Sequence, residues 1–336
     1  MSKSALPVFV GVDVGGTNIK LGLVADDGTV LAKSSFPTQV DLGPQHVVEQ
    51  TKIEVDRLVQ TSDLAASQIV AVGLGTPGPM DIGRGLILQP TNLPTWKDFP
   101  IRDRLSSQLG LPVTFTNDAN AAAYGEYWMG SANSYRSLVF FTLGTGVGGG
   151  IIVDDFCVEG AHSLGAELGH MVVDTRPEAL VCSCGRPGHL EAYSSATAVV
   201  SRTRIGIASG VKTSLCDDEN LTARTIFEAA EGDDELALQI VDETAHHLAT
   251  GIAIVAHVID PEAILFGGAM NFGGRDSKTG RRFLDQITKQ VHNSVFPEIY
   301  NSLKIDFAQL GSDAGYIGAA GLARVQYQKH LRVASF

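Results

Sequence analysis

The first thirty residues alternate between apolar and polar positions, and glycine interrupts the alternation. It runs up to Asp13, breaks at residues 15–16, resumes over residues 19–24 and turns again at residues 27–28. An alternation with period two is typical of strands, whereas glycine and aspartate are typical of turns. The pattern therefore predicts a meander of three strands.

Helical spacing follows this meander. Residues 44–60 place their apolar side chains three and four positions apart, which predicts a helix. Residues 69–74 return to a strand pattern, and residues 101–109 predict a short helix that starts after Pro100.

The same succession then begins again. Residues 113–117 predict a strand, an alanine-rich helix follows from Asp118, and residues 137–153 predict a strand, a glycine turn and a second strand. We interpret this as one βββα-type unit used twice, with a glycine turn large enough for a phosphate in each copy.

The pattern is less regular beyond residue 155. Residues 155–230 are expected to be rich in loops, and they hold the four cysteines. A long helix is expected over residues 233–258, a strand over 263–268 and a last helix over 314–328. A chain of 336 residues exceeds the size of one ordinary core, so we expect two domains joined by a hinge of two crossovers.

Net charge narrows the possible partners. The formal charge of -12 argues against nucleic-acid binding, which depends on clustered lysine and arginine. It is compatible with a phosphate ligand, because backbone N–H groups and a bound cation can hold one locally.

Location follows from the apolar segments and the cysteines. The first ten residues lack the long apolar region of a signal peptide, and no segment approaches about 18 uninterrupted apolar residues. We therefore expect no membrane association. Cys182 and Cys184 are too close in sequence to bridge comfortably, so we expect a reducing cytoplasm rather than a disulfide framework.

Residues 144–149, GTGVGG, match the spacing of a dinucleotide-binding turn. That turn must open a helix whose N-terminus faces the pyrophosphate, but here a strand pattern follows. The alternatives left are an ordinary tight β-turn and a glycine hairpin whose backbone can approach phosphate oxygens.

The first glycine turn carries a carboxylate. Residues 13–20, DVGGTNIK, supply Asp13 at a strand end, a glycine turn and the hydroxyl of Thr17. A carboxylate beside phosphate is repulsive unless a cation lies between them, so Asp13 suggests Mg²⁺.

These motifs, taken in order, resemble those of the glucokinases of the ROK family (repressor, ORF, kinase). The resemblance runs nearly from end to end of the chain. It rests on DVGGTNIK (13–20), GTPGPMD (75–81), NDANAAAYGE (117–126), TLGTGVGGG (142–150), GAELGH (165–170), CSCGRPGHLE (182–191), LFGGAM (265–270) and SDAGYIGAA (312–320).

The resemblance implies a two-domain actin-like ATPase fold of the sugar kinase/ribonuclease H-like type, α/β in class, with a cleft between the domains. The small domain would span residues 1–116 plus 317–336, and the large domain residues 117–316. The implied activity is the transfer of phosphate from ATP, with Mg²⁺, to the 6-hydroxyl of glucose. The residues implied for ATP are Asp13, Gly15, Gly16, Thr17, Lys20, Gly144, Thr145, Gly146, Gly267 and Gly268.

Asp118 is the candidate general base. Phosphoryl transfer to an alcohol needs a carboxylate that accepts the hydroxyl proton, and the resemblance gives Asp118 that role. The alternative from the residues alone is that Asp118 caps a helix, which is common for aspartate. The residues implied for the sugar are Gly75, Asn117, Asp118, Glu167, His170 and Glu191.

His170, Cys182, Cys184 and His189 form a possible zinc site. Two thiolates and two imidazoles suit tetrahedral Zn²⁺, and the spacing is His-x11-Cys-x-Cys-x4-His. The family pattern has a third cysteine where this chain has His189. The alternative is therefore that zinc was lost and that His189 is a surface residue. A structural zinc would fix the loop at residues 165–191.

Other functions remain open at this stage. Fructokinase, N-acetylmannosamine kinase and mannose kinase use the same parts, and polyphosphate is an alternative donor. A non-catalytic sugar sensor would not need Asp118 and both glycine hairpins. We do not expect a repressor of the same family, because it would need a DNA-binding extension ahead of the first hairpin, which begins by residue 11. The resemblance also implies a homodimer or homotetramer.

Overall fold

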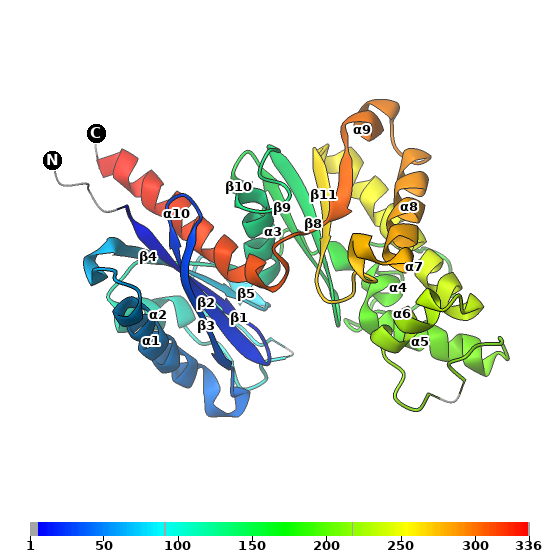
Figure 1. Cartoon of the computed structure of the whole chain (residues 1–336), viewed down its shortest axis with the longest axis horizontal. Helices are drawn as coiled ribbons and strands as arrows, with labels where there is room; N and C mark the ends of the chain where they lie inside the picture. The colour runs from blue at the N-terminus through cyan, green and yellow to red at the C-terminus, as the bar shows by residue number, and fades with distance from the viewer. Residues whose placement is uncertain (1–5, 91, 217, 335–336) are drawn as a thin grey trace.

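Two five-stranded sheets organise the chain into two lobes, as the computed structural model shows (Figure 1). It describes residues 6–90, 92–216 and 218–334. The strand order is β3-β2-β1-β4-β7 in the first sheet and β10-β9-β8-β11-β12 in the second. In each sheet the earliest strand pairs antiparallel with the next one and parallel with the fourth. The shared order confirms the interpretation of one unit used twice.

The strands of the first sheet are β1 (Val8–Val14), β2 (Asn18–Ala25), β3 (Val30–Pro37), β4 (Ile69–Thr76) and β7 (Val113–Asn117). Its helices are α1 (Gly43–Thr61) and α2 (Ile101–Leu109), and a small hairpin joins β5 (Met80–Asp81) to β6 (Leu86–Ile87). The second sheet contains β8 (Ser137–Leu143), β9 (Val147–Val153), β10 (Phe156–Cys157), β11 (Ala263–Gly267) and β12 (Lys304–Phe307). The other helices are α3 (Asp118–Trp128), α4 (Glu191–Ser194), α5 (Ala196–Ala208), α6 (Ala223–Glu231), α7 (Glu235–Ile259), α8 (Lys278–His292), α9 (Pro297–Ser302) and α10 (Ala314–Ala334).

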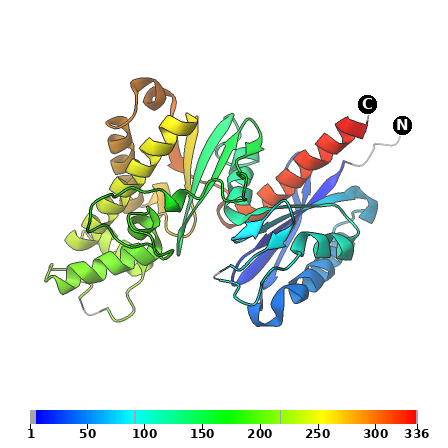
Figure 2. The same cartoon turned by 180° about the vertical axis from the view of Figure 1, so that it is seen from behind.

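Alternation along β1 explains how the first sheet is covered on both faces. Val10 and Val12 pack into a core with α1 and α2, whereas Phe9 packs with Tyr316 of α10 on the other face. Figure 2 shows α1 and α2 on the side of the sheet away from α10. Because successive side chains of a strand point to opposite faces, one apolar strand serves both layers.

Helix α10 lies directly on the backbone of the first sheet. A Cβ atom at Gly11 of β1 would overlap the carbonyl oxygen of Tyr316, and one at Gly73 of β4 would overlap that of Ala319. Glycine is therefore required at both positions for this close approach. The last helix in sequence thus belongs to the packing of the first sheet.

The second sheet repeats this division. Val139 and Phe141 of β8 face a large core with α7 and α8, whereas Leu138 and Phe140 face α3. This core continues into α5 and α6. The helices of this lobe therefore lie on the face away from α3.

The chain passes between the sheets twice, through α3 after β7 and through α10 after β12. The two helices pack against each other where the lobes join (Figure 1). The buried Glu126 of α3 ties both crossovers, since it accepts hydrogen bonds from Leu310 N–H (2.6 Å) and Ser131 N–H (3.0 Å). This arrangement agrees with the expected hinge of two crossovers; the domain boundaries at residues 116 and 316 stay predictions.

The expectation for the second lobe was incomplete. Most of the described part of the segment 155–230 lies outside helices and strands, as expected, but the segment also contains α4, α5 and α6, and α8, α9 and β12 were not expected. The other predicted elements are present, and α2 and β7 have the predicted bounds. Among the helices of residues 6–90, 92–216 and 218–334, we find none with the length and apolar character needed to span a membrane.

Candidate active site

Two neighbouring cavities lie where the lobes meet. The cleft cavity, of about 830 Å³, is lined by Asn92 and Asn117 from the first lobe and by Gly144, Glu167 and Glu191 from the second. The inner cavity, of about 240 Å³, is lined by residues that include Asp13, Lys20, Asp118, Gly267 and Gly268. Asp118, Ala119 and Thr142 line both cavities. Asp118 therefore lies at the boundary between the two spaces.

Asp118 is the first residue of α3, and Asn117 is its cap. The Asn117 Oδ1 accepts hydrogen bonds from Ala119 N–H at 2.8 Å and Asn120 N–H at 3.4 Å. The Asp118 Oδ1 also accepts from Ala119 N–H, at 2.8 Å. Capping is thus done mainly by Asn117, so the helix-cap alternative does not account for Asp118.

Burial raises the pKa of the Asp118 carboxyl above its ordinary value, and the nearby Glu167 raises it further. Hydrogen bonds to the carboxylate from the start of α3 oppose this change. A carboxylate with a raised pKa is a stronger base than an exposed one. The environment of Asp118 therefore suits proton abstraction.

Asn117 can serve the cleft only through its amide nitrogen. Its carbonyl oxygen already accepts the two hydrogen bonds that start α3. The remaining donors of Nδ2 can reach an oxygen of a bound molecule, because Asn117 lines the cleft cavity.

Glu167, His170 and Glu191 line the same cavity, as expected for a polyhydroxyl ligand. Glu191 is fixed by two contacts: its Oε2 accepts from Val147 N–H (3.0 Å) and its Oε1 from Ser183 Oγ (2.7 Å). Burial raises the pKa of Glu167, while His170 opposes and Glu191 supports that rise. The three side chains surround a space in which carboxylates can accept hydroxyl hydrogen bonds.

Gly75 lies outside both cavities. A Cβ atom at this position would stand 3.2 Å from the Cβ of Ala121 and 3.7 Å from the Cα of Asp118. Gly75 thus lets the start of α3 pack closely on β4, and its contact with the sugar stays a prediction.

The residues predicted for ATP are distributed over several places. Asp13, Lys20, Gly267 and Gly268 line the inner cavity, and Gly144 and Gly146 line the cleft cavity. Thr145 lines a third cavity, of about 560 Å³, with residues of α5 and α6. Gly15, Gly16 and Thr17 form the turn between β1 and β2, outside these three cavities.

The glycines of the second hairpin differ in their surroundings. A Cβ atom at Gly144 would meet no atom within 4 Å, so open space lies there. A Cβ atom at Gly146 would overlap Oε2 of Glu191, and Gly268 has a φ of 90° beside Leu143. Gly144 therefore leaves room for a ligand, whereas Gly146 and Gly268 are needed by the protein itself.

Asp13 and Asp118 place two carboxyl groups in the wall of the inner cavity. Burial raises the pKa of Asp13 to about 7; Asp118 adds to the rise, and Lys20 opposes it. Two carboxylates in one small cavity favour a bound cation. The donor set thus fits a hard cation such as Mg²⁺.

His170, Cys182, Cys184 and His189 come together as predicted, with ligand atoms within 4.8 Å of one another. The Nδ1 atoms of the two histidines are 3.3 Å apart, and Cys184 Sγ is 3.2 Å from His189 Nδ1. A tetrahedral zinc with Zn–N bonds of about 2.0–2.1 Å would separate two nitrogens by about 3.3 Å. Burial lowers the pKa of His189, and the charge of the neighbouring His170 lowers it further. A lowered pKa favours the neutral ring that binds metal. The four residues therefore fit zinc.

Several residues that line the cleft cavity were not predicted from the sequence, among them Ser183 and Asn92. Ser183 lies between the two metal-site cysteines and donates a hydrogen bond to Glu191. The spacing of the cysteines marks this loop and was therefore a signal that could have identified Ser183. Asn92 reaches the cleft cavity from a loop of the first lobe, and no motif marks it.

Comparisons with known proteins agree with this geometry. The family model described as ROK family matches residues 9–326. A glucokinase of Halalkalibacterium halodurans is 34% identical over 322 residues, which are 95% of this chain and 95% of that protein. The ROK hexokinase of Thermus thermophilus superposes with a TM-score of 0.82 at 29% identity, covering 96% of this chain and 99% of that one. The ROK family glucokinase of Streptomyces griseus, solved in complex with glucose and AMPPNP, gives a TM-score of 0.74 at 32% identity, covering 95% and 99%.

Proposed function

The chain belongs to the ROK family and has the actin-like ATPase fold of its sugar kinases, and on that premise we propose that it transfers the γ-phosphate of ATP to the 6-hydroxyl of glucose. The observation that carries this proposal is the position of Asp118 in the wall of both cavities. A base between a sugar space and a phosphate space is what phosphoryl transfer to an alcohol requires.

The reaction follows from the residues around the two cavities. Asn117, Glu167, His170 and Glu191 would bind the sugar and direct its primary hydroxyl towards Asp118. Asp118 accepts the hydroxyl proton while the sugar oxygen forms a bond to phosphorus and the bond from phosphorus to the ADP oxygen breaks. Lobe closure would exclude water from the cleft, which limits hydrolysis of the donor.

The nucleotide would occupy the inner cavity and the glycine hairpin. Asp13 would hold Mg²⁺, which when bound neutralises phosphate charge. The open space at Gly144 supports close approach of phosphate oxygens to the backbone, and Gly267 and Gly268 would lie near the adenine.

We also propose that His170, Cys182, Cys184 and His189 bind one structural Zn²⁺. This is supported by the 3.3 Å separation of the two histidine nitrogens. The metal would fix the segment 165–191, which carries Glu167, His170 and Glu191. Free thiols at Cys157, Cys182, Cys184 and Cys216 support a reducing cytoplasm, and a homodimer or homotetramer remains part of the proposal.

A coupled assay tests the function directly. Glucose, mannose, fructose and N-acetylmannosamine are each offered with ATP or with polyphosphate, and product formation is followed. We expect the highest kcat/KM with glucose and ATP. A higher value with another hexose would identify a different ROK hexose kinase, and sugar binding without phosphorylation would identify a sensor.

A further inference from the structure

The hydroxyl of Tyr193 holds the segment between the metal-site histidine and the cysteines from behind. Tyr193 belongs to α4 and is 3% exposed. Its Oη accepts a hydrogen bond from Leu180 N–H (2.7 Å) and donates one to Asp174 Oδ2 (2.7 Å). Leu180 precedes Cys182 by two residues, and Asp174 follows His170 by four. One side chain thus fastens both arms of the segment 171–181.

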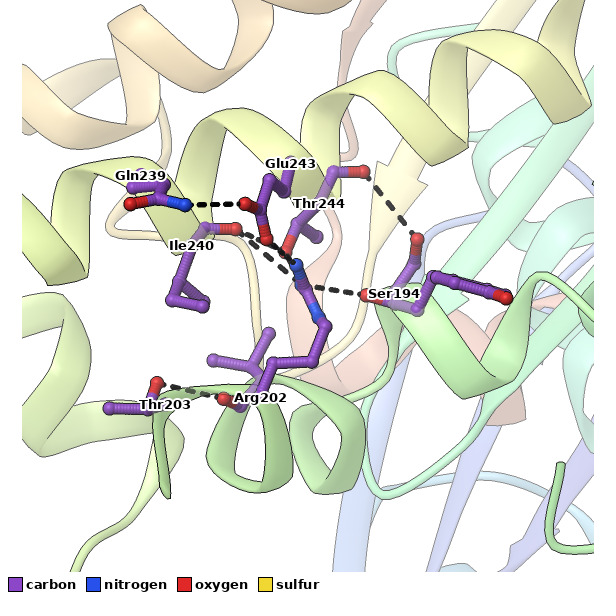
Figure 3. A network of polar contacts seen from close by, with 9 residues as sticks. Ser194, Arg202, Thr203, Gln239, Ile240, Glu243 and Thr244 are labelled. Carbon is purple, nitrogen blue, oxygen red and sulfur yellow. Dashed lines mark hydrogen bonds and ion pairs between the residues drawn. The ribbon is translucent and has the colours of Figure 1, made fainter. Parts of the chain in front are cut away.

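Arg202 anchors the backbone of Tyr193 to the helical core of the second lobe. Its Nη2 donates to the carbonyl oxygen of Tyr193 (2.8 Å) and to Thr244 Oγ1 (2.5 Å), and its Nη1 donates to Glu243 Oε2 (2.8 Å). Figure 3 shows Arg202 reaching from α5 towards Glu243 and Thr244 of α7. Helix α4, although only four residues long, is therefore held firmly by α5 and α7.

The same short helix carries a residue of the sugar cavity. Glu191 is its first residue, and His189 precedes it by two. Tyr193 lies two residues beyond Glu191. Both side chains bind the cysteine segment (residues 180–184): Tyr193 accepts a hydrogen bond from Leu180 N–H, and Glu191 accepts one from the hydroxyl of Ser183. The position of α4 thus determines where Glu191, His189 and the cysteine segment lie relative to one another.

We propose that Tyr193 is a positioning residue. Its hydroxyl holds Leu180 and thereby the cysteine segment, and this keeps the residues proposed to bind glucose and zinc in place relative to one another. This inference rests on the proposed glucokinase function for its kinetic part. Asp174 keeps three further hydrogen bonds from Arg176, at 3.1, 2.9 and 2.8 Å. Loss of the hydroxyl would therefore leave mainly Leu180 N–H without a partner. Leu180 and Tyr193 line a cavity of about 720 Å³ that is distinct from the cleft cavity.

Tyr193→Phe tests the proposal, because the ring keeps its packing on His247, with ring centres 4.1 Å apart. Tyr300→Phe is the matched control, since Tyr300 packs on His292 with ring centres 4.0 Å apart and lies in α9, away from the cleft. For the zinc-loaded Tyr193 variant we expect faster amide exchange at Leu180, faster zinc release to a chelator and a higher KM for glucose, each by about fivefold or more. The kcat value and the KM for ATP should change by less than about twofold, as loss of a positioning contact would leave the chemical step intact.

The outcomes separate this proposal from the proposed function. Exchange, zinc release and KM unchanged in Tyr193→Phe, with an active wild-type enzyme, would overturn the role of Tyr193. A fall in kcat with unchanged KM would also overturn it. A wild-type protein that phosphorylates none of the hexoses would overturn the function, while amide exchange and zinc release would still report on Tyr193.

Discussion

Glu191 accepts a hydrogen bond from the backbone N–H of Val147 over 3.0 Å. Glu191 belongs to the wall of the cleft cavity, and Val147 begins β9 at the end of the glycine hairpin. A sugar that displaces the carboxylate of Glu191 would therefore also displace the backbone of the hairpin proposed to hold phosphate. This contact offers a direct physical link between the two substrates.

The link can be tested with two alanine substitutions in one hairpin. Gly146→Ala would push Glu191 aside, because the added Cβ overlaps its Oε2, and we expect the KM for glucose to rise about tenfold or more. Gly144→Ala adds a Cβ to open space, so only the KM for ATP should rise. Steady-state kinetics with each substrate varied in turn provide the measurement. Equal effects of the two variants on glucose would refute the link.

Asp118→Asn removes the proposed base but keeps the side-chain shape. We expect kcat to fall about a hundredfold or more, while the dissociation constant of glucose changes by a few-fold at most. Rapid kinetics and calorimetric binding measure the two quantities. Asp103→Asn, which removes a first-turn charge from α2, is the control and should leave both quantities unchanged. Near-normal turnover of the Asp118 variant would contradict the assignment.

Asp13 should make the ligand-free protein less stable as the pH rises. Its pKa is about 7 in the folded state against an ordinary 3.8, so the folded chain binds more protons between these values and loses stability as the pH rises through them. Without Mg²⁺ or nucleotide, Asp13→Asn should increase the free energy of unfolding at pH 8 by a few kcal/mol, and the gain should shrink at pH 5. Urea unfolding at both pH values measures this.

The control for this test is Asp27→Asn. Hydrogen bonds from Thr29 lower the pKa of Asp27, so its replacement should give no gain at pH 8. If Asp13→Asn were no more stable than the wild type at pH 8, the unfavourable burial of this carboxylate would be disproved.

His189 is the position where this chain departs from the zinc ligands of its family. His189→Ala should lower the zinc content below one per chain and raise the KM for glucose, with little change in the KM for ATP. His189→Cys should restore both, because thiolate is also a zinc ligand. Cys216→Ala, outside the cluster, should keep its zinc. Elemental analysis of each purified protein measures the content, and a metal-free wild type with full activity would exclude the zinc proposal.

Local signals were sufficient for much of the fold. The bounds of α2 were predicted because Pro100 precedes it and Gly110, with a φ of 68°, ends it. Helix α5 was missed because Arg202 lies on its buried face and interrupts the apolar stripe. The partner that makes this burial possible, Glu243, comes from α7 and cannot be recognised from the α5 sequence. Helix α8 had a usable signal, since Phe283, Leu284, Ile287 and Val291 follow helical spacing.

In the candidate site, too, some residues could be predicted from local sequence patterns and some contacts could not. The four metal-site residues were found because they lie within 20 positions of one another in a recognisable spacing. The bond from Val147 to Glu191 joins residues 44 positions apart, and no local pattern indicates it. Gly75 was assigned to the sugar from its motif, yet its neighbours are Ala121 and Asp118 in the packing of α3 on β4.

The close packing of α10 on the first sheet determines the order in which the lobes can fold while the chain is synthesised on the ribosome. Residues 8–117 emerge first, but one face of their sheet stays bare at Gly11, Gly73 and Phe9 until α10 arrives. The second sheet and its covering helices are complete once β12 has been made. The lobe that is synthesised later can therefore assemble its core against α7 and α8 first, whereas the earlier lobe must wait for the end of the chain, as must the face of the second sheet that packs with Leu322 and Val325 of α10.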